Sequence, residues 1–358
     1  MGAIGGVVLR VLKAEIRTSL KVVLSGSLIG WKAFACAIFI AASVTFAQDV
    51  AQIETPPPGA LDPTSDLWPA DLLQISSTEA FSKHVLLVDK AQRKLLIFER
   101  SGESIHKIFD VSTDIGKNGG NKTRRDDQRT PEGIYIFQKK LTQPEIPFDQ
   151  YGKIAFTTDY PNFFDRMENK TGSGIWLHSI PETVALTRGS RGCVVVRNEV
   201  VEKLQSYIKL KETPLIIYDK LDYLTKEEHN RRRVKMTEYL DSWVSAWQSM
   251  DVEKYLTYYD EKFTAPGFNL RSWKRHKENL KNKYKYIKVT LSQPFVLLHR
   301  DQLIIKTLQK YESNEHSDYG VKTIYAAKRG EGYKILREEW VPAQEDGTVM
   351  GVADSSPR

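Results

Sequence analysis

The sequence predicts two domains, a mainly β domain followed by an α+β domain. Short runs of β-branched and aliphatic residues, separated by turn residues, dominate residues 81–222. From residue 229 onward, helical patterns precede a series of longer strand-like runs, which is the order of an α+β domain. The chain of 358 residues is long enough for both, and its 41% hydrophobic and 27% charged residues are typical of soluble globular domains.

Residues 1–47 have the pattern of an export signal. Five basic residues, the last of them Lys32, precede an apolar run over 33–47 that ends in small residues, with Ala47 as the expected cleavage position. This run is short for a transmembrane helix, which needs about 20 residues, although an uncleaved N-terminal anchor is the alternative. In either case we expect the rest of the chain outside the cytoplasm, in contact with a membrane only through an uncleaved signal.

The charge of the chain does not predict nucleic-acid binding. Residues 1–47 hold five basic residues and one acidic residue, so the formal charge falls from +7 to +3 when they are removed. A mildly basic protein is compatible with work beside an anionic polymer or surface. The seven histidines are scattered and form no ligand pair with carboxylates at a useful spacing, so we expect no metal site and no cofactor.

The segment 48–80 is predicted to be a linker, because the prolines from Pro56 to Pro58 favour an extended chain. The first domain then spans 81–222. A short helix is expected to begin at Asn198 as its N-cap, and a polar, charged loop is expected over 116–129. Strands are predicted over 85–89, 94–98, 105–112, 134–137, 154–157, 174–178, 193–196 and 214–218, the first two as a hairpin.

The second domain is predicted over 229–342, followed by a loose polar tail over 343–358. Aromatic residues at helical spacing indicate a first helix around Trp243, and Asp251 is expected to cap a second one. A basic helix over 271–283 follows. Strands are expected over 286–291, 302–311, 320–327 and 332–339.

Cys193 is the strongest candidate for chemistry. The other cysteine, Cys36, lies in the predicted signal, so the mature protein would carry a single thiol in an oxidising compartment, where cysteines are usually paired. A thiolate nucleophile needs a base, which His178 at a neighbouring strand end could supply. Gly192 would let backbone N–H groups approach a reacting carbonyl as an oxyanion hole. The alternative is a buried structural cysteine beside an unrelated histidine.

Two segments carry a resemblance to a known family. Ile-Trp-Leu-His-Ser over 175–179, followed by Ser-Arg-Gly-Cys-Val-Val over 190–195, resembles the signature of the L,D-transpeptidase (YkuD-type) catalytic domain. The Gly116-Lys117 loop and the runs over 129–135 and 151–156 are similar to those of its periplasmic subgroup. The resemblance extends over about residues 82–220, with several motifs in the family's order and spacing, and it implies a periplasmic protein.

The resemblance implies a β-rich fold that binds peptidoglycan stem peptides. Cys193 would attack the bond after the third residue of a tetrapeptide stem and release D-alanine. His178 would be the base, Ser179 would orient the imidazole through its backbone carbonyl, and the amides of Gly192 and Cys193 would form the oxyanion hole. An amine acceptor makes the enzyme a transpeptidase and water makes it an L,D-carboxypeptidase. An amidase that releases wall-linked protein and an inactive wall-binding scaffold are further alternatives.

The sequence departs from the family pattern beside the cysteine. Arg191 stands where many members have histidine, and Val195 where many have arginine. Arginine stays charged, so Arg191 can bind a carboxylate or stabilise a thiolate but cannot shuttle protons. We assign Arg191, Ser190, Arg129 and Trp176 as substrate contacts.

The charged loop over 117–129 has two interpretations. It is either a solvated loop or a flexible lid that contacts the carboxylates of the stem peptide. In the second case the contacts would come from Lys122, Arg124, Arg125 or Arg129.

The second domain resembles the nuclear-transport-factor-2-like (SnoaL-like) cone, in a region of about 229–342. Its aromatics Trp243, Trp247, Tyr255 and Tyr259 belong either to the core or to a ligand platform. We expect a noncatalytic pocket that helps to bind substrate or a partner. The combination of both domains is similar to that of L,D-carboxypeptidases that trim tetrapeptides and affect cell shape.

Overall fold

The structure is a computed structural model that describes residues 67–75, 80–102, 104–292 and 294–344. The predicted signal over 1–47 lies outside these residues. None of the helices within these ranges combines the length and the apolar character that crossing a membrane requires.

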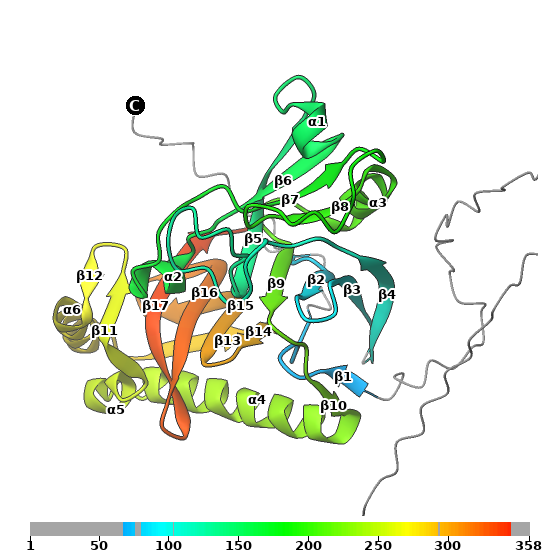
Figure 1. Cartoon of the computed structure of the whole chain (residues 1–358). Coiled ribbons are helices and arrows are strands. Elements are labelled where there is room, and N and C mark those ends of the chain that lie inside the picture. The colour runs from blue at the N-terminus through cyan, green and yellow to red at the C-terminus, as the bar shows by residue number, and fades with distance from the viewer. Residues whose placement is uncertain (1–66, 76–79, 103, 293, 345–358) are drawn as a thin grey trace, which may run out of the picture. The chain divides into compact units, whose positions relative to one another are not determined.

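The first domain is built on an eight-stranded mixed sheet with the strand order β4-β3-β2-β9-β5-β6-β7-β8 (Figure 1). Neighbouring strands are antiparallel except for the pairs β2–β9 and β7–β8, which are parallel. Three short helices and a 3₁₀ turn accompany the sheet. The elements are β2 His84–Asp89, β3 Lys94–Ser101, β4 Ser104–Ser112, β5 Gly133–Thr142, α1 Phe148–Tyr151, β6 Ile154–Thr158, α2 Phe163–Met167, β7 Trp176–Ile180, β8 Val194–Arg197, α3 Asn198–Leu204, η1 Gln205–Tyr207 and β9 Pro214–Tyr218.

The eight predicted strands of this domain are present, with shifted ends. Strand β8 begins at Val194, so Cys193 lies just before it rather than inside it. The prediction for Asn198 was wrong, because it is the first helical residue and Arg197 occupies the N-cap position. The side-chain oxygen of Asn198 accepts a hydrogen bond from the Lys153 backbone N–H at 2.9 Å. A tertiary contact therefore uses the oxygen that a local cap would need.

The second domain holds a seven-stranded sheet with the order β12-β11-β17-β16-β15-β13, in which β14 also pairs with β15. The long helix α4 lies across these strands (Figure 1). Its buried side chains Leu240 and Trp243 share a core with Leu303, Ile305 and Ile324 of the sheet. The elements are α4 Lys226–Gln248, α5 Val252–Leu256, β11 Tyr259–Ala265, β12 Phe268–Asn269, α6 Leu270–Lys283, β13 Ile287–Leu291, β14 Phe295–His299, β15 Gln302–Ser313, β16 Ser317–Arg329 and β17 Gly332–Pro342.

The structure confirms the predicted helices and strands of this domain. It also has three strands that were not predicted, namely β11, β14 and the two-residue β12. Asp251 caps α5 as expected, and its side chain accepts a hydrogen bond from the Lys254 N–H at 3.1 Å. The observed order is α4 and α5, the strands β11 and β12, helix α6 and then a meander of longer strands, which is an α+β domain.

The prediction of a linker over 48–80 was wrong for residues 67–75. Strand β1 (Leu67–Pro69) pairs antiparallel with β10 (Tyr223–Thr225). Trp68, Leu72 and Ile75 are buried in a hydrophobic cluster that includes side chains of both large sheets. Burial of these apolar side chains gives a favourable free energy that an exposed linker would not have. The segment therefore packs on the core although a Pro-rich stretch precedes it.

Candidate functional site

The parallel pair β7–β8 brings the two candidate catalytic residues to neighbouring positions in the sheet. Leu177 is paired with Val194 and His178 with Val195. Cys193 directly precedes Val194, so the register places it beside Trp176 at the start of β7. Two residues that are fifteen positions apart in the chain therefore lie on β7 and immediately before the adjacent strand β8.

Cys193 is a half-buried free thiol and the one cysteine in the described part of the chain. Its Sγ donates to the backbone carbonyl of Gly174 at 3.4 Å. Burial raises the pKa of the thiol to about 11, although a backbone hydrogen bond from Trp176 and the charge of Arg191 act in the opposite direction. The resting group is therefore a thiol at neutral pH.

His178 is buried and oriented by the backbone. Its Nδ1 donates to the carbonyl oxygen of Ser179 at 2.8 Å, and its ring meets the ring of Tyr151 edge-on at 5.1 Å between centroids. The proton on Nδ1 leaves Nε2 as an acceptor. Burial lowers the pKa of the imidazole to about 4, and the charge of Arg188 adds to this effect. His178 is therefore neutral at pH 7.

The side-chain hydroxyl of Ser190 closes the turn that runs from Ser190 to Cys193. Ser190 Oγ donates to the carbonyl of Cys193 at 2.7 Å and accepts from the Gly192 N–H at 3.0 Å. The Gly192 amide thus has a partner in the resting structure. It becomes available to a substrate oxygen only when this bond opens.

No residue other than glycine fits at position 192. Its φ is +124°, and a Cβ there would lie 2.7 Å from the carbonyl oxygen of Arg129. Both the backbone conformation and the close approach of another backbone segment require glycine. The turn that carries Cys193 is therefore packed directly against the end of the charged loop.

Asp114 supports this turn, and the sequence analysis did not find it. Its buried carboxylate forms an ion pair with Arg93 and accepts from the Gly189 N–H at 2.8 Å. Its backbone N–H and carbonyl bond to Val195 at 2.8 Å each. The signal available in the sequence was an acidic residue two positions after the end of a predicted strand.

The loop over 117–129 is fixed by internal hydrogen bonds, which contradicts the idea of a flexible lid that uses Lys122. The Lys122 ammonium is buried and pairs with Asp127 at 2.7 Å. Burial alone would raise the pKa of Asp127, but Lys122 and the N–H groups of Thr123, Arg124 and Arg129 lower it to about 2. Lys122 therefore has a structural role within the loop.

The residues assigned as substrate contacts lie at different depths. Arg191 is exposed, whereas Arg129 and Trp176 are half-buried and Ser190 is buried. The ring of Trp176 packs on Tyr151 with 5.0 Å between centroids. Tyr151 thus contacts both Trp176 and His178, although sequence reasoning did not single out its side chain.

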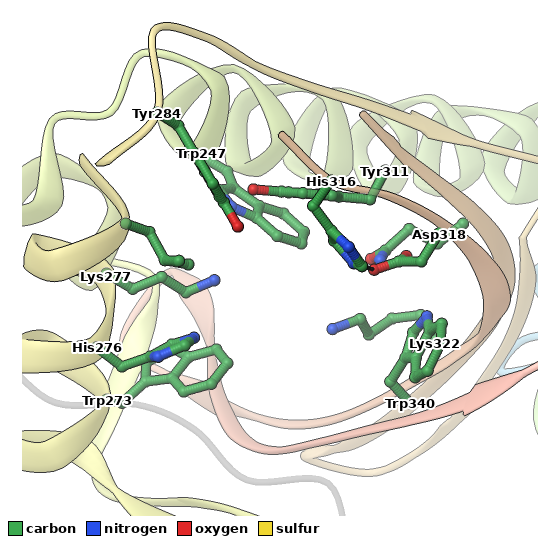
Figure 2. A pocket seen from close by; sticks show the side chains of 12 residues that line it. Trp247, Trp273, His276, Lys277, Tyr284, Tyr311, His316, Asp318, Lys322 and Trp340 are labelled. Carbon is green, nitrogen blue, oxygen red and sulfur yellow. Dashed lines mark hydrogen bonds and ion pairs between the residues drawn. The ribbon is translucent and has the colours of Figure 1, made fainter. Parts of the chain in front are cut away.

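The second domain contains a cavity of about 400 Å³ between α6 and the strands (Figure 2). Lys277 of α6 and Lys322 of β16 both point into it. The aromatic residues anticipated from the sequence divide here: Trp247 lines the cavity, while Trp243, Tyr255 and Tyr259 belong to the core. The lining residues are Trp247, Trp273, His276, Lys277, Leu280, Tyr284, Gln309, Tyr311, His316, Asp318, Lys322 and Trp340.

Lys277 is the unusual charge of this cavity. Its ammonium lies 4.3 Å from the ring centroids of Trp247 and Trp273, and burial lowers its pKa to about 7. Lys322, in contrast, pairs with Glu338 at 2.7 Å. Five polar atoms of the lining residues have no hydrogen-bond partner among the described residues: Trp247 Nε1, Trp273 Nε1, Gln309 Oε1, Tyr311 OH and Asp318 Oδ1. A cavity lined by buried polar atoms without partners is typical of a ligand site.

Comparisons with known proteins match both domains. Residues 83–217 match the L,D-transpeptidase catalytic domain, and residues 235–339 match the Cds6 C-terminal NTF2-like domain. The solved structure of Bd1075 from Bdellovibrio bacteriovorus is 62% identical, with a TM-score of 0.73, and the match covers 78% of this chain and 100% of that one. The chain belongs to the L,D-transpeptidase (YkuD) family with a C-terminal NTF2-like domain.

Other solved members of similar architecture are more distant. The helical cell shape determining protein Pgp2 from Campylobacter jejuni is 24% identical, with a TM-score of 0.58, and the match covers 75% of this chain and 97% of that one. A point mutant of Pgp2 is 23% identical, with a TM-score of 0.60. Its match covers 75% of this chain and 94% of the mutant chain. No curated protein matches the chain. L,D-transpeptidase domains act on peptidoglycan stem peptides, and such enzymes are generally periplasmic.

Proposed function

We propose that this protein is a periplasmic cysteine acyl-transferase of peptidoglycan, an L,D-transpeptidase that acts on tetrapeptide stems. The observation that carries the proposal is the pairing of β7 with β8. In this register Cys193, the single described thiol, comes two positions before Val195, the residue that pairs with His178, and the Nδ1 proton of this neutral histidine is already bound. The family membership supplies the substrate class.

Cys193 is the proposed nucleophile and His178 the proposed base. As the sulfur attacks the carbonyl carbon of the third stem residue, its proton passes to Nε2 of His178. The C–N bond to D-alanine then breaks, and the leaving amine takes that proton. The Ser179 carbonyl holds the imidazole in the required tautomer throughout. A thioester between Cys193 and the shortened stem remains.

The resting geometry requires a rearrangement before attack. Among the described residues no hydrogen bond joins Cys193 to His178, since the thiol faces the Gly174 carbonyl. Catalytic hydrogen bonds are often long before substrate binds. The Gly192 amide must also leave Ser190 Oγ before it can stabilise a developing oxyanion. We assign both changes to the arrival of the stem peptide, with Arg191, Ser190, Arg129 and Trp176 as its contacts.

The acceptor separates the alternatives. An amine from a second stem gives a cross-link, water gives a tripeptide and an L,D-carboxypeptidase, and a wall-linked protein as substrate gives an amidase. Pgp2 is described as a determinant of helical cell shape. By analogy we extend a role in cell shape to this chain, and either the cross-linking or the trimming reaction would serve it.

The cavity of the second domain is the proposed accessory site for the same polymer. Lys277 offers a positive charge to a stem carboxylate, and the tryptophans around it offer flat apolar faces. A second point of attachment raises the effective concentration of stems at Cys193 without any change in the chemistry.

The test is mass spectrometry of the purified protein incubated with disaccharide-tetrapeptide, beside Cys193→Ala. Release of D-alanine with dimers joined through two diaminopimelates would support the transpeptidase, and a tripeptide alone the carboxypeptidase. Cys193→Ala should reduce either product at least about 10³-fold, as loss of a nucleophile does. Full activity of Cys193→Ala would refute the mechanism. No product from the wild type would favour the amidase or an inactive scaffold.

A further inference from the structure

A second cavity, of about 300 Å³, lies away from Cys193 and is lined by both sheets. The catalytic domain contributes Asp159, Phe163 and Arg166, which follow β6. The NTF2-like domain contributes Lys306 of β15, Tyr325 of β16 and Glu339 of β17. The volume suits an amino acid or the end of a peptide. Its charged residues decide which.

Asp159 is an acid without a cation. Its Oδ1 accepts from the Ile136 backbone N–H at 2.8 Å, and within the described ranges its carboxylate joins no ion pair. Burial raises its pKa to about 6 and the nearby Asp165 adds to this, while backbone hydrogen bonds and Arg166 act in the opposite direction. The carboxylate thus bears a desolvation cost that no direct ion pair within the described ranges offsets.

Lys306 is the corresponding base without an acid. Its ammonium lies 5.6 Å from the ring centroid of Phe81, and it has no salt bridge in the part of the chain that the structure describes. Burial lowers the pKa of this amine, and Lys209 acts in the same direction, while Glu212 and Glu339 act against it. Glu339 itself is bound to Arg337 at 2.6 Å. Lys306 therefore also bears a desolvation cost that no direct ion pair among the described residues offsets.

The wall between these charges is aromatic. Phe163 and Tyr325 pack with 5.2 Å between ring centroids, one from each domain. Asp159 and Glu339 both act electrostatically on Tyr325, so they face the same space. Arg166, Lys211 and Glu339 also line this cavity. An apolar surface with an acid and a base that form no ion pair within the described ranges matches a small ligand with both charges and a short side chain.

We propose that this cavity binds an α-amino carboxylate zwitterion, with its ammonium on Asp159 and its carboxylate on Lys306. A ligand with a single charge would leave the other buried group uncompensated, whereas a zwitterion neutralises both. Two sources present this chemistry: a free amino acid such as D-alanine, and the amino-acid end of diaminopimelate in a stem peptide. The proposal needs no turnover, because the cavity does not include Cys193 or His178.

Binding should be linked to proton release. The other charged groups around Asp159 are Asp165, Arg166 and Lys211 from its own domain and Lys306 and Glu339 from the other. An ammonium ligand favours the ionised Asp159, which is about half protonated near pH 6 in the free protein. We therefore expect about half a proton to be released per ligand at pH 6 and almost none at about pH 8. Affinity should fall as the pH drops below 6.

The experiment is isothermal titration calorimetry of the full protein with D-alanine and with a diaminopimelate tripeptide. Each titration is run in two buffers of different ionisation enthalpy. Asp159→Asn and Lys306→Met should each weaken binding at least tenfold, and Asp159→Asn should abolish the proton release. The matched controls are Asp149→Asn in α1 and Lys140→Met in β5, both exposed. If Lys306→Met does not fold, Lys306→Arg should fold and retain binding.

The single-charge analogues N-acetyl-D-alanine and D-alaninamide should bind at least tenfold more weakly than D-alanine. Saturable binding of D-alanine identifies a free amino acid as the source, and binding of the tripeptide alone identifies the stem. Either result supports the proposal. It is overturned if neither probe binds, if an analogue binds equally well, or if Asp159→Asn leaves the affinity unchanged. Because Cys193-dependent product formation is assayed separately, a failure here does not touch the catalytic proposal.

Discussion

At the residue scale, Cys193 and His178 are both shifted toward their neutral forms. Burial raises the pKa of the thiol to about 11 and lowers that of the imidazole to about 4. A thiolate–imidazolium pair would need the opposite shifts. Proton transfer is thus expected to accompany attack on the substrate rather than to precede it.

The pH dependence of thiol alkylation tests this picture. The rate of reaction of Cys193 with iodoacetamide should rise about tenfold per pH unit from about pH 7 to pH 9.5. A thiolate forms only as the pH approaches the raised pKa. His178→Asn should leave this profile nearly unchanged while it removes turnover. A rate that is already maximal at neutral pH would contradict a neutral pair.

At the element scale, the site depends on contacts between loops and on the cavity wall formed by α6. Residues 114–117 hold the turn before β8: the Ser190 N–H bonds to the Ile115 carbonyl at 2.8 Å, and the Lys117 N–H bonds to the Ser190 carbonyl at 3.0 Å. The strands themselves were predictable from their alternating and apolar patterns. Asp114 was not, because its partners Arg93 and Gly189 lie 21 and 75 positions away.

Helix α6 gives a prediction for the accessory cavity. Lys277→Met should lower the affinity for purified peptidoglycan sacculi at least tenfold, because it removes the positive charge that the cavity offers. Arg275→Met, which removes an exposed charge from the same helix, is the matched control and should bind as wild type. Co-sedimentation with sacculi measures both. Equal retention of the two variants would exclude the cavity as a wall-binding site.

At the scale of the whole molecule, the two domains share buried groups. Arg300 of the NTF2-like domain pairs with Glu132 of the catalytic domain at 2.5 Å, and the other oxygen of Glu132 pairs with buried Lys90 at 2.7 Å. Lys90 also donates to the Gly120 carbonyl at 2.7 Å, in the loop that ends against Gly192. The support of the catalytic turn thus extends to the second domain.

Acid stability is a property of the whole fold. Burial lowers the pKa of His299 to about 3, with the charges of Arg300 and Lys170 acting in the same direction. The ordinary pKa of histidine is 6.5. Below that pH the unfolded chain binds a proton at His299 that the folded protein does not bind. The stability that the neutral group preserves is therefore lost as the pH falls from 6.5 to about 3. His178 contributes with the same sign, on the order of 3 kcal/mol.

His299→Phe should therefore reduce the loss of stability between about pH 7 and pH 4.5. Phenylalanine binds no proton, so one difference in proton binding between the unfolded and folded states is removed. Urea unfolding midpoints at the two pH values measure the difference. His106→Gln, at an exposed position in β4, should show the pH dependence of the wild type. An unchanged pH dependence in His299→Phe would contradict the buried neutral state of His299.

The sequence by itself determined most of the long elements in their order, the two domain types and the identity of Cys193 and His178 as candidates. These depend on local periodicity and on side-chain chemistry that can be read within a few residues. Only the tertiary structure decided that Ser190 holds the Gly192 amide, that Lys122 is buried in its loop and that residues 67–75 join the core. It also placed Asp159 and Lys306, 147 positions apart, around one cavity. Hydrogen bonds and buried charges between distant segments follow from how strands of separate domains pack, and no short stretch of sequence contains that information.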